Sequence, residues 1–143
     1  MISKTKLPGF YKKFDVVSVF IENAGEILLL LRQDHKPQGN TWGMPAGKVK
    51  HGEALLDALV REVREEIGLR IYRQECKYSE GYYVRYTDYD FLYHVYHLFV
   101  PEKPTLNINM NEHKDYRWVK PVEALKLDLI QDEDFVVKWC YGV

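Results

Sequence analysis

The segment from Glu53 to Ile67 constrains the fold of this chain more than any other. At about 100° per residue, its leucine, valine and isoleucine side chains fall on one broad apolar face. Gly68 follows directly, at the position where helices commonly end in a left-handed residue. The sequence therefore predicts an amphipathic helix that must pack its apolar face against another layer of the domain.

Strand signals precede this helix. Residues Phe14 to Ile21 are β-branched and aromatic, and Glu26 to Arg32 is a leucine-rich run. The turn residues of Glu22 to Gly25 lie between them, which predicts a hairpin. From Gln33 to Gly47 the periodicity is lost, and three glycines and two prolines predict a long ordered loop, a kind of segment that is often functional.

The rest of the chain predicts further strands and two helical segments. No repeat, low-complexity tract or linker divides the sequence, so we expect one domain over residues 1–143. Because strands and helices alternate only in part, the fold class expected is α/β (α+β), a mixed sheet with helices packed on it. The segments are strand-like at Arg70–Tyr78, Tyr82–Tyr86, Phe91–Val100 and Asp115–Val119, a helical turn at Pro121–Leu125, and a terminal helix at Asp132–Tyr141.

Composition excludes several classes of partner. The 20 Lys and Arg residues balance the 21 Asp and Glu residues, which argues against a protein that coats duplex nucleic acid. The longest purely apolar run, Ile27 to Leu31, is too short to span a bilayer, and no apolar stretch of signal-peptide length begins the sequence. Two cysteines, Cys76 and Cys140, make neither a disulfide framework nor a zinc motif. We therefore expect a cytoplasmic protein with no membrane partner.

The polar side of the predicted helix carries three carboxylates. Glu62, Glu65 and Glu66 gather within an arc of about 100°, because residues three and four apart project from neighbouring turns. Arg61 and Arg64 could neutralise them in part, which would make this an ordinary solvated face. A divalent cation would neutralise them better, since Mg²⁺ prefers oxygen ligands and binds beside substrate phosphates. The helix alone leaves both readings open.

The spacing around the helix decides between these readings. Gly47 is followed after five residues by Glu53 and after seven more by Arg61–Glu62–Val63, then by Glu65–Glu66 and Gly68–Leu69. This pattern resembles the Nudix box at every defined position over 23 residues. The resemblance implies an α/β/α sandwich with a mixed β-sheet. It also implies hydrolysis of a nucleoside diphosphate linked to another group, with Mg²⁺, or Mn²⁺ in its place, as cofactor.

The same resemblance implies roles for the box residues. The glutamates matching Glu62 and Glu66 bind metal, and the one matching Glu65 assists. The metals would neutralise the pyrophosphate, and a water deprotonated by a glutamate would attack phosphorus. Glu53 and Arg61 match a supporting pair that holds the loop against the helix.

Residues outside the helix complete the predicted metal site. Ala46 matches a position whose backbone carbonyl is a metal ligand in many relatives; glycine is commoner there, but a carbonyl ligand does not depend on the side chain. Gly47 and Gly52 are expected to permit a tight path into the helix. Glu112, six residues before Trp118, is a candidate ligand or general base, and the alternative is a surface acid. The choice of base between Glu62 and Glu112 stays open.

Substrate signals are weaker. Val84 and Arg85 stand where a proline would suggest ADP-ribose, and Tyr86, 17 residues after Leu69, is a weak mark for dinucleoside polyphosphates. Arg32 and Lys48 could reach phosphates, although exposed basic residues usually only solubilise.

Several functional readings remain. Nucleoside triphosphates (damaged ones included), dinucleoside polyphosphates and nucleotide sugars all stay open as small-molecule substrates. A homodimer is also open. The alternative to an enzyme is a Nudix module that binds and senses a nucleotide, but such modules commonly lose the box glutamates that this chain keeps. An isoprenoid diphosphate isomerase of the same fold is disfavoured, because it would carry an active-site cysteine.

Overall fold

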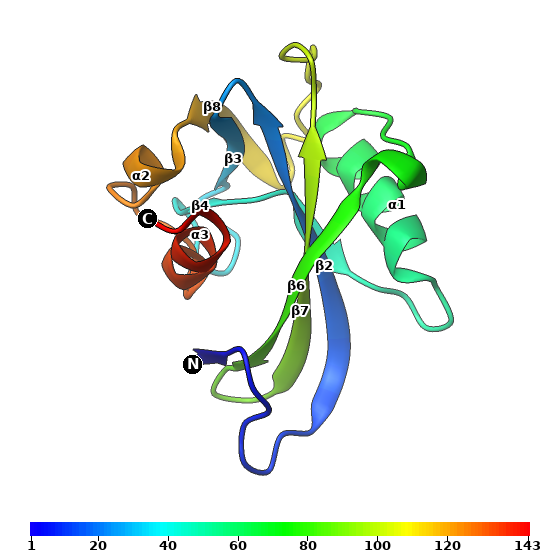
Figure 1. Ribbon diagram of the computed structural model, residues 1–143, viewed down its shortest axis with the longest axis vertical. Coiled ribbons are helices and arrows are strands. Elements are labelled where there is room, and N and C mark those ends of the chain that lie inside the picture. The colour runs from blue at the N-terminus through cyan, green and yellow to red at the C-terminus, as the bar shows by residue number, and fades with distance from the viewer.

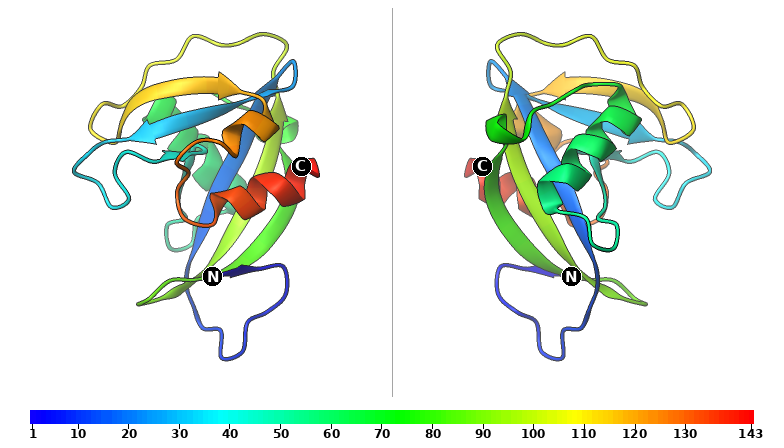
Figure 2. Two further views of the ribbon diagram at one scale, coloured as in Figure 1. Left: turned by 90° about the vertical axis from the view of Figure 1, so that its left-hand side faces the viewer. Right: turned by 90° about the vertical axis from the view of Figure 1, so that its right-hand side faces the viewer.

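The computed structural model describes residues 1–143, which form one eight-stranded mixed sheet with helices on both faces (Figures 1 and 2). The main path of the sheet runs β1-β6-β7-β2-β3-β4, with β5 also paired to β2 and β8 to β3. The strands are β1 (Ile2–Ser3), β2 (Lys12–Asn23), β3 (Glu26–Arg32), β4 (Trp42–Gly43), β5 (Ala46–Lys48), β6 (Lys77–Arg85), β7 (Asp90–Phe99) and β8 (His113–Val119). The helices are α1 (Leu55–Ile67), the 3₁₀ turn η1 (Arg73–Glu75), α2 (Pro121–Ala124) and α3 (Glu133–Tyr141).

Two apolar cores lie on opposite faces of the sheet. Leu59, Val63 and Ile67 of α1 are buried in one core with alternate residues of β2 and β3. Val136 and Val137 of α3 belong to the other core. The pair β2–β7 is parallel and the other strand pairs are antiparallel, so the predicted α/β/α sandwich with a mixed sheet is confirmed.

The predicted hairpin is confirmed only at its turn. The residues Ala24 and Gly25 have φ of 50° and 82°, and β2 pairs with β3 at just two registers next to them. Beyond these registers the strands diverge, because β2 bonds to β5 and β7 while β3 bonds to β8 and β4. Both strands line the cavities described below, through Val16 of β2 and Arg32 of β3.

Helix α1 begins at Leu55, two residues later than predicted. Its N-cap Ala54 makes no capping hydrogen bond, and the side chain of Glu53 is bound to Arg61 instead. The helix ends as predicted, since Gly68 has φ of 67° and donates its N–H to the carbonyl of Arg64.

Two predicted segments need correction. Residues 70–76 contain the turn η1 rather than a strand, and Arg73 of this turn pairs with Asp57 of α1. Strand β6 begins at Lys77 and includes most of the predicted strand Tyr82–Tyr86. The predicted loop 33–47 contains β4 and the first two residues of β5, which are too short to show periodicity and depend on pairing with β3 and β2.

The C-terminal elements are confirmed within two residues of the predicted bounds. Strand β8 begins at His113, and α3 follows Asp132, which has φ of 69°. None of the helices is long and apolar enough to cross a membrane.

Candidate active site

An outer cleft of about 700 Å³ lies between α1, β5 and the β6–β7 turn. It brings together all four glutamates predicted for the metal site, together with the three basic and aromatic residues predicted for substrate. Its lining includes Glu62, Glu65, Glu66 and Glu112, the basic Arg32, Lys36 and Lys48, the aromatic Phe14, Tyr86, Tyr89 and Phe91, and Ala46 and Gly47.

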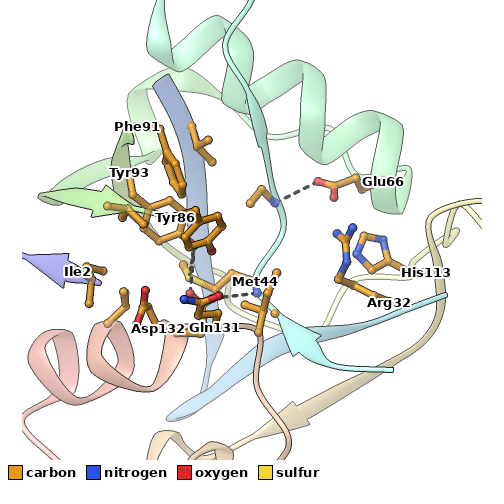
Figure 3. A pocket seen from close by; sticks show the side chains of 17 residues that line it. Ile2, Arg32, Met44, Glu66, Tyr86, Phe91, Tyr93, His113, Gln131 and Asp132 are labelled. Carbon is orange, nitrogen blue, oxygen red and sulfur yellow. Dashed lines mark hydrogen bonds between the residues drawn. The ribbon is translucent and has the colours of Figure 1, made fainter. Parts of the chain in front are cut away.

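Glu66 is the most buried of these glutamates, with 8% of its surface exposed. The backbone N–H of Ala46 donates to its Oε2 at 3.1 Å, a contact drawn in Figure 3. Burial raises the pKa of Glu66 well above its usual value, and the negative charges of Glu62 and Glu112 raise it further. A negative charge is unfavourable on a buried carboxylate that has two acidic neighbours and no basic side chain bound to it, and a bound cation would offset this cost.

Glu62 lies directly against Gly47. A Cβ atom at Gly47 would stand 2.0 Å from the Cδ atom of Glu62. Gly47 is therefore needed to make room for this carboxylate, a role that the sequence did not predict. Gly52, with φ of 77° and nothing within 4 Å of its Cβ position, does have the conformational role predicted for it.

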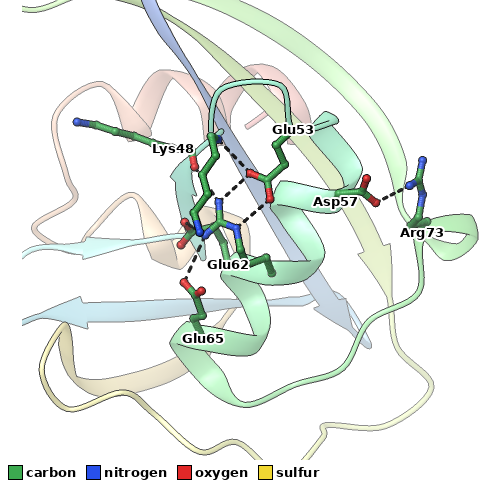
Figure 4. A network of polar contacts seen from close by, with 8 residues as sticks. Lys48, Glu53, Asp57, Glu62, Glu65 and Arg73 are labelled. Carbon is green, nitrogen blue, oxygen red and sulfur yellow. Dashed lines mark hydrogen bonds and ion pairs between the residues drawn. The ribbon is translucent and has the colours of Figure 1, made fainter.

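Arg61 connects the helix to the loop before it by hydrogen bonds to Glu53 and Lys48, two residues labelled in Figure 4. Its Nε and Nη2 atoms each donate to one carboxylate oxygen of Glu53 at 2.9 Å, and Nη2 also donates to the carbonyl of Lys48 at 3.1 Å. The guanidinium lowers the pKa of Glu53 to about 2. Glu53 and Arg61, the predicted supporting pair, are thus in contact. Their two charge-assisted hydrogen bonds fix the orientation of the loop before α1 relative to the helix.

The four glutamates line the same cleft, but their carboxylates do not converge on one point where a metal ion could bind. Arg61 Nη1 donates to Glu62 Oε1 at 2.7 Å and to the exposed Glu65 at 3.4 Å, and Lys36 Nζ binds Glu112 at 3.1 Å. Consequently no three acidic, histidine or cysteine side chains converge as a ready-made metal cage. The donors are nevertheless all oxygen atoms around an uncompensated buried carboxylate, and that chemistry fits a hard divalent cation.

The predicted substrate residues lie along the same cleft. Arg32 ends β3 and donates its Nε to the carbonyl of Pro37 at 2.8 Å. Lys48 Nζ stands 4.4 Å from the ring centre of Phe14, and Tyr86 forms part of the opposite lining. None of the three is held by an acidic side chain.

An inner pocket of about 150 Å³ opens beside the cleft, at the start of α3 (Figure 3). Both cavities are lined by Arg32, Ala46, Glu66, Tyr86 and Phe91. The remaining polar residues of the pocket are Tyr93, His113, Gln131, Asp132 and Glu133.

Sequence reasoning did not find this pocket. Its lining comes from all eight strands, the end of α1 and the start of α3, so no single segment carries its whole pattern. The alternation of Phe91 and Tyr93 along one strand is a local signal that could have indicated it.

Two buried polar side chains distinguish the inner pocket. Glu133 is 3% exposed; its Oε1 accepts the N–H of Met44 and its Oε2 accepts the hydroxyl of Tyr93, both at 3.2 Å. Burial raises the pKa of Glu133 to about 7. His113 is 4% exposed, its Nδ1 has no hydrogen-bond partner, and burial lowers its pKa to about 4.

Comparison with known proteins agrees with this geometry. The sequence model of the NUDIX domain matches residues 12–140. The CTP pyrophosphohydrolase of Escherichia coli (strain K12) is 32% identical over 120 residues, 82% of this chain and 84% of that protein. The nucleoside triphosphatase NudI of Escherichia fergusonii is 32% identical over 124 residues, 80% of this chain and 86% of its own. The solution structure of the E. coli ORF135 protein superposes with a TM-score of 0.73 at 30% identity, covering 94% of this chain and 91% of that one.

Proposed function

The chain belongs to the Nudix family and is a Nudix hydrolase, and from its site we propose that it hydrolyses a pyrophosphate bond of nucleoside triphosphates with the help of a divalent cation. The observation that carries the proposal is Glu66. This buried carboxylate has acidic neighbours in the outer cleft and also lines the inner pocket. A cation bound by Glu66 would therefore lie at the junction of the two cavities, next to the phosphates of a nucleotide that occupies both.

The relatives support the triphosphate class. Two of the similar proteins are named as enzymes of nucleoside triphosphates, one of them specifically of CTP. In this reading the base enters the inner pocket and the triphosphate lies along the outer cleft. The cations of Arg32 and Lys48 would then contact phosphate oxygens, and Lys36 could join them by leaving its ion pair with Glu112.

Five groups would hold the cation: the carboxylates of Glu62, Glu65, Glu66 and Glu112 and the backbone carbonyl of Ala46. Once bound, a divalent cation neutralises phosphate charge and makes a water acidic enough to act as the nucleophile. Mg²⁺ suits this all-oxygen donor set, and Mn²⁺ accepts the same ligands. For Glu62 to turn toward the cation, Arg61 gives up one hydrogen bond and stays anchored by Glu53 and the Lys48 carbonyl.

Two glutamates compete for the role of general base. Glu112 lies on the cleft at the loop before β8, and its ion pair with Lys36 leaves one carboxylate oxygen free. Glu62 carries the Arg61 hydrogen bond on Oε1 only. Either residue could take the proton of the attacking water, and the variant experiments in the Discussion separate them.

The proposal also concerns the domain organisation and the partners of the chain. Residues 1–143 act as one Nudix domain on a small nucleotide, without duplex nucleic acid or membrane partners. The cytoplasmic location stays a prediction, and a homodimer stays open.

A panel of nucleotides tests the proposed function. Phosphate and pyrophosphate release is measured from canonical and oxidised triphosphates, dinucleoside polyphosphates and nucleotide sugars, with Mg²⁺, with Mn²⁺ and with chelator. We expect cation-dependent pyrophosphate release from triphosphates, well above the other classes. Faster hydrolysis of another class would overturn the substrate assignment, and activity unaffected by chelator would overturn the metal site.

A further inference from the structure

The carboxylate of Glu133 has no part in the metal chemistry. It lies in the inner pocket, and its hydrogen bonds go to Met44 of the loop after β4 and Tyr93 of β7, not to any group of the outer cleft. Burying a carboxylate this completely is costly unless polar partners compensate, and the two donors do so in part. A fully buried acid that lines a ligand-sized cavity is a candidate for ligand recognition.

The size of the inner pocket limits what can enter it. Its volume is about 150 Å³. A protein cavity of about 150 Å³ accommodates benzene, a single six-membered ring. The aromatic side chains of Tyr86, Phe91 and Tyr93 line the pocket and offer faces on which such a ring can pack. A one-ring base therefore matches the volume of the pocket, whereas a two-ring purine would have to extend into the adjoining outer cleft.

The chemistry of Glu133 limits the base further. A hydrogen bond donated by a ligand favours the ionised form of Glu133. In that form the carboxylate only accepts hydrogen bonds, and its two oxygens offer about four lone-pair sites. Met44 and Tyr93 donate to one site on each oxygen, which leaves the others free for a ligand. Cytosine presents an amino group that can donate to such an oxygen, whereas uracil presents a carbonyl oxygen at the same ring position.

We infer that Glu133 is a specificity-determining residue that selects cytosine in the inner pocket by accepting a hydrogen bond from its amino group. Tyr93 and the Met44 N–H act as positioning groups that fix the carboxylate. This inference rests on the proposed function, because it assumes that the base of the nucleotide substrate occupies this pocket.

Substitution of Glu133 by glutamine tests the inference. The amide has nearly the same size and can donate to the carbonyl oxygen of uracil, so the ratio of kcat/KM for CTP over UTP should fall by about tenfold or more. Asp134→Asn is the matched control, because Asp134 is the next acid in the same helical turn. Its Oδ2 atom lies 3.9 Å from Lys138 Nζ, and it does not line the inner pocket. The control should keep the wild-type ratio.

A second experiment changes the ligand and leaves the protein intact, so it holds even if the glutamine variant does not fold. The wild-type chain is assayed with CTP, with UTP and with the triphosphate of pyrimidin-2-one riboside, which lacks any group at the 4-position. We expect CTP to exceed both pyrimidine analogues, and ATP and GTP, by about tenfold or more in kcat/KM.

The outcomes separate this inference from the proposed function. If the chain hydrolyses triphosphates but treats CTP and UTP alike, prefers purines, or keeps its ratio in Glu133→Gln, the inference is wrong and the proposed function stands. If no nucleotide is hydrolysed, the proposed function fails, and calorimetric titration with CMP and UMP decides the inference. Tighter CMP binding that Glu133→Gln abolishes would support it, and equal or absent binding would overturn it.

Discussion

The side chain of Glu62 occupies the space that a Cβ atom would take at Gly47, with only 2.0 Å between that position and the Glu62 Cδ atom. The two residues come from adjacent elements, β5 and α1, which Arg61 also links through the Lys48 carbonyl. A glycine of the box thus positions a carboxylate of the box by leaving room for it.

We predict that Gly47→Ala lowers kcat by about 100-fold, because the new methyl group displaces Glu62 by an ångström or more. The matched control is Gly52→Ala. Its φ of 77° strains alanine by about 1 kcal/mol of unfolding free energy. That control should lower the melting temperature and keep most of the activity. If Gly47→Ala retained wild-type kcat, Glu62 would not need its present position.

Glu66→Gln should abolish most turnover while the fold survives. The amide removes the charge that would hold the cation, and we expect kcat/KM to fall by about 100-fold or more, with weaker Mg²⁺ affinity. Stability should not fall, because glutamine has nearly the same size and its amide oxygen can still accept the N–H of Ala46. Titration of Mn²⁺ monitored by electron paramagnetic resonance provides a readout of the cation itself. Unchanged Mn²⁺ affinity would place the metal elsewhere.

The general base can be assigned by comparing Glu62→Gln and Glu112→Gln. Loss of the base should lower kcat by about 10²- to 10⁴-fold and remove the acidic limb of the pH–rate profile, whereas loss of a ligand should mainly raise the cation requirement. Both variants are measured from pH 5 to 9 at saturating and limiting Mg²⁺. If Glu112→Gln left rate, profile and cation requirement unchanged, Glu112 would be only a partner of Lys36.

The stability of the chain should depend on pH through Glu133. Its pKa rises from 4.5 to about 7 on folding, chiefly by burial, so the folded state favours the protonated form. The stability that the protonated group provides is lost as the pH rises from about 4.5 to about 7, by on the order of 3 kcal/mol.

The melting temperature of wild type minus that of Glu133→Gln, followed across this pH range, isolates the effect from other titrating groups. The difference should become more negative with rising pH. A difference that stays constant would mean that Glu133 keeps an ordinary pKa.

Much of the catalytic half of the site follows from the sequence. The spacing of Glu62, Glu65 and Glu66 on a helix fixes their common face, and the bounds of β3 and the C-terminal end of α1 were predicted to the residue. Local periodicity suffices where one segment carries the whole pattern.

The rest depends on contacts between distant segments. Residues 73–75, which favour a strand, form a 3₁₀ turn instead, and Arg73 of this turn pairs with Asp57, 16 residues away. Glu133 receives hydrogen bonds from residues 40 and 89 positions away in the sequence. No window of the sequence contains both partners, and its charge alone would place Glu133 on the surface.

β2 and β3 pair only next to their turn, and the pocket beyond it is lined by residues of both α1 and α3. Glu62, Glu65 and Glu66 come from α1 on one face of the sheet, and Glu133 comes from α3 on the other. The proposed metal ligands and the residue proposed to select the base thus come from two stretches of sequence that do not pack in the same core. Such a division lets a lineage change the nucleotide it consumes by altering the start of one helix, while the machinery that breaks the phosphate bond is inherited intact.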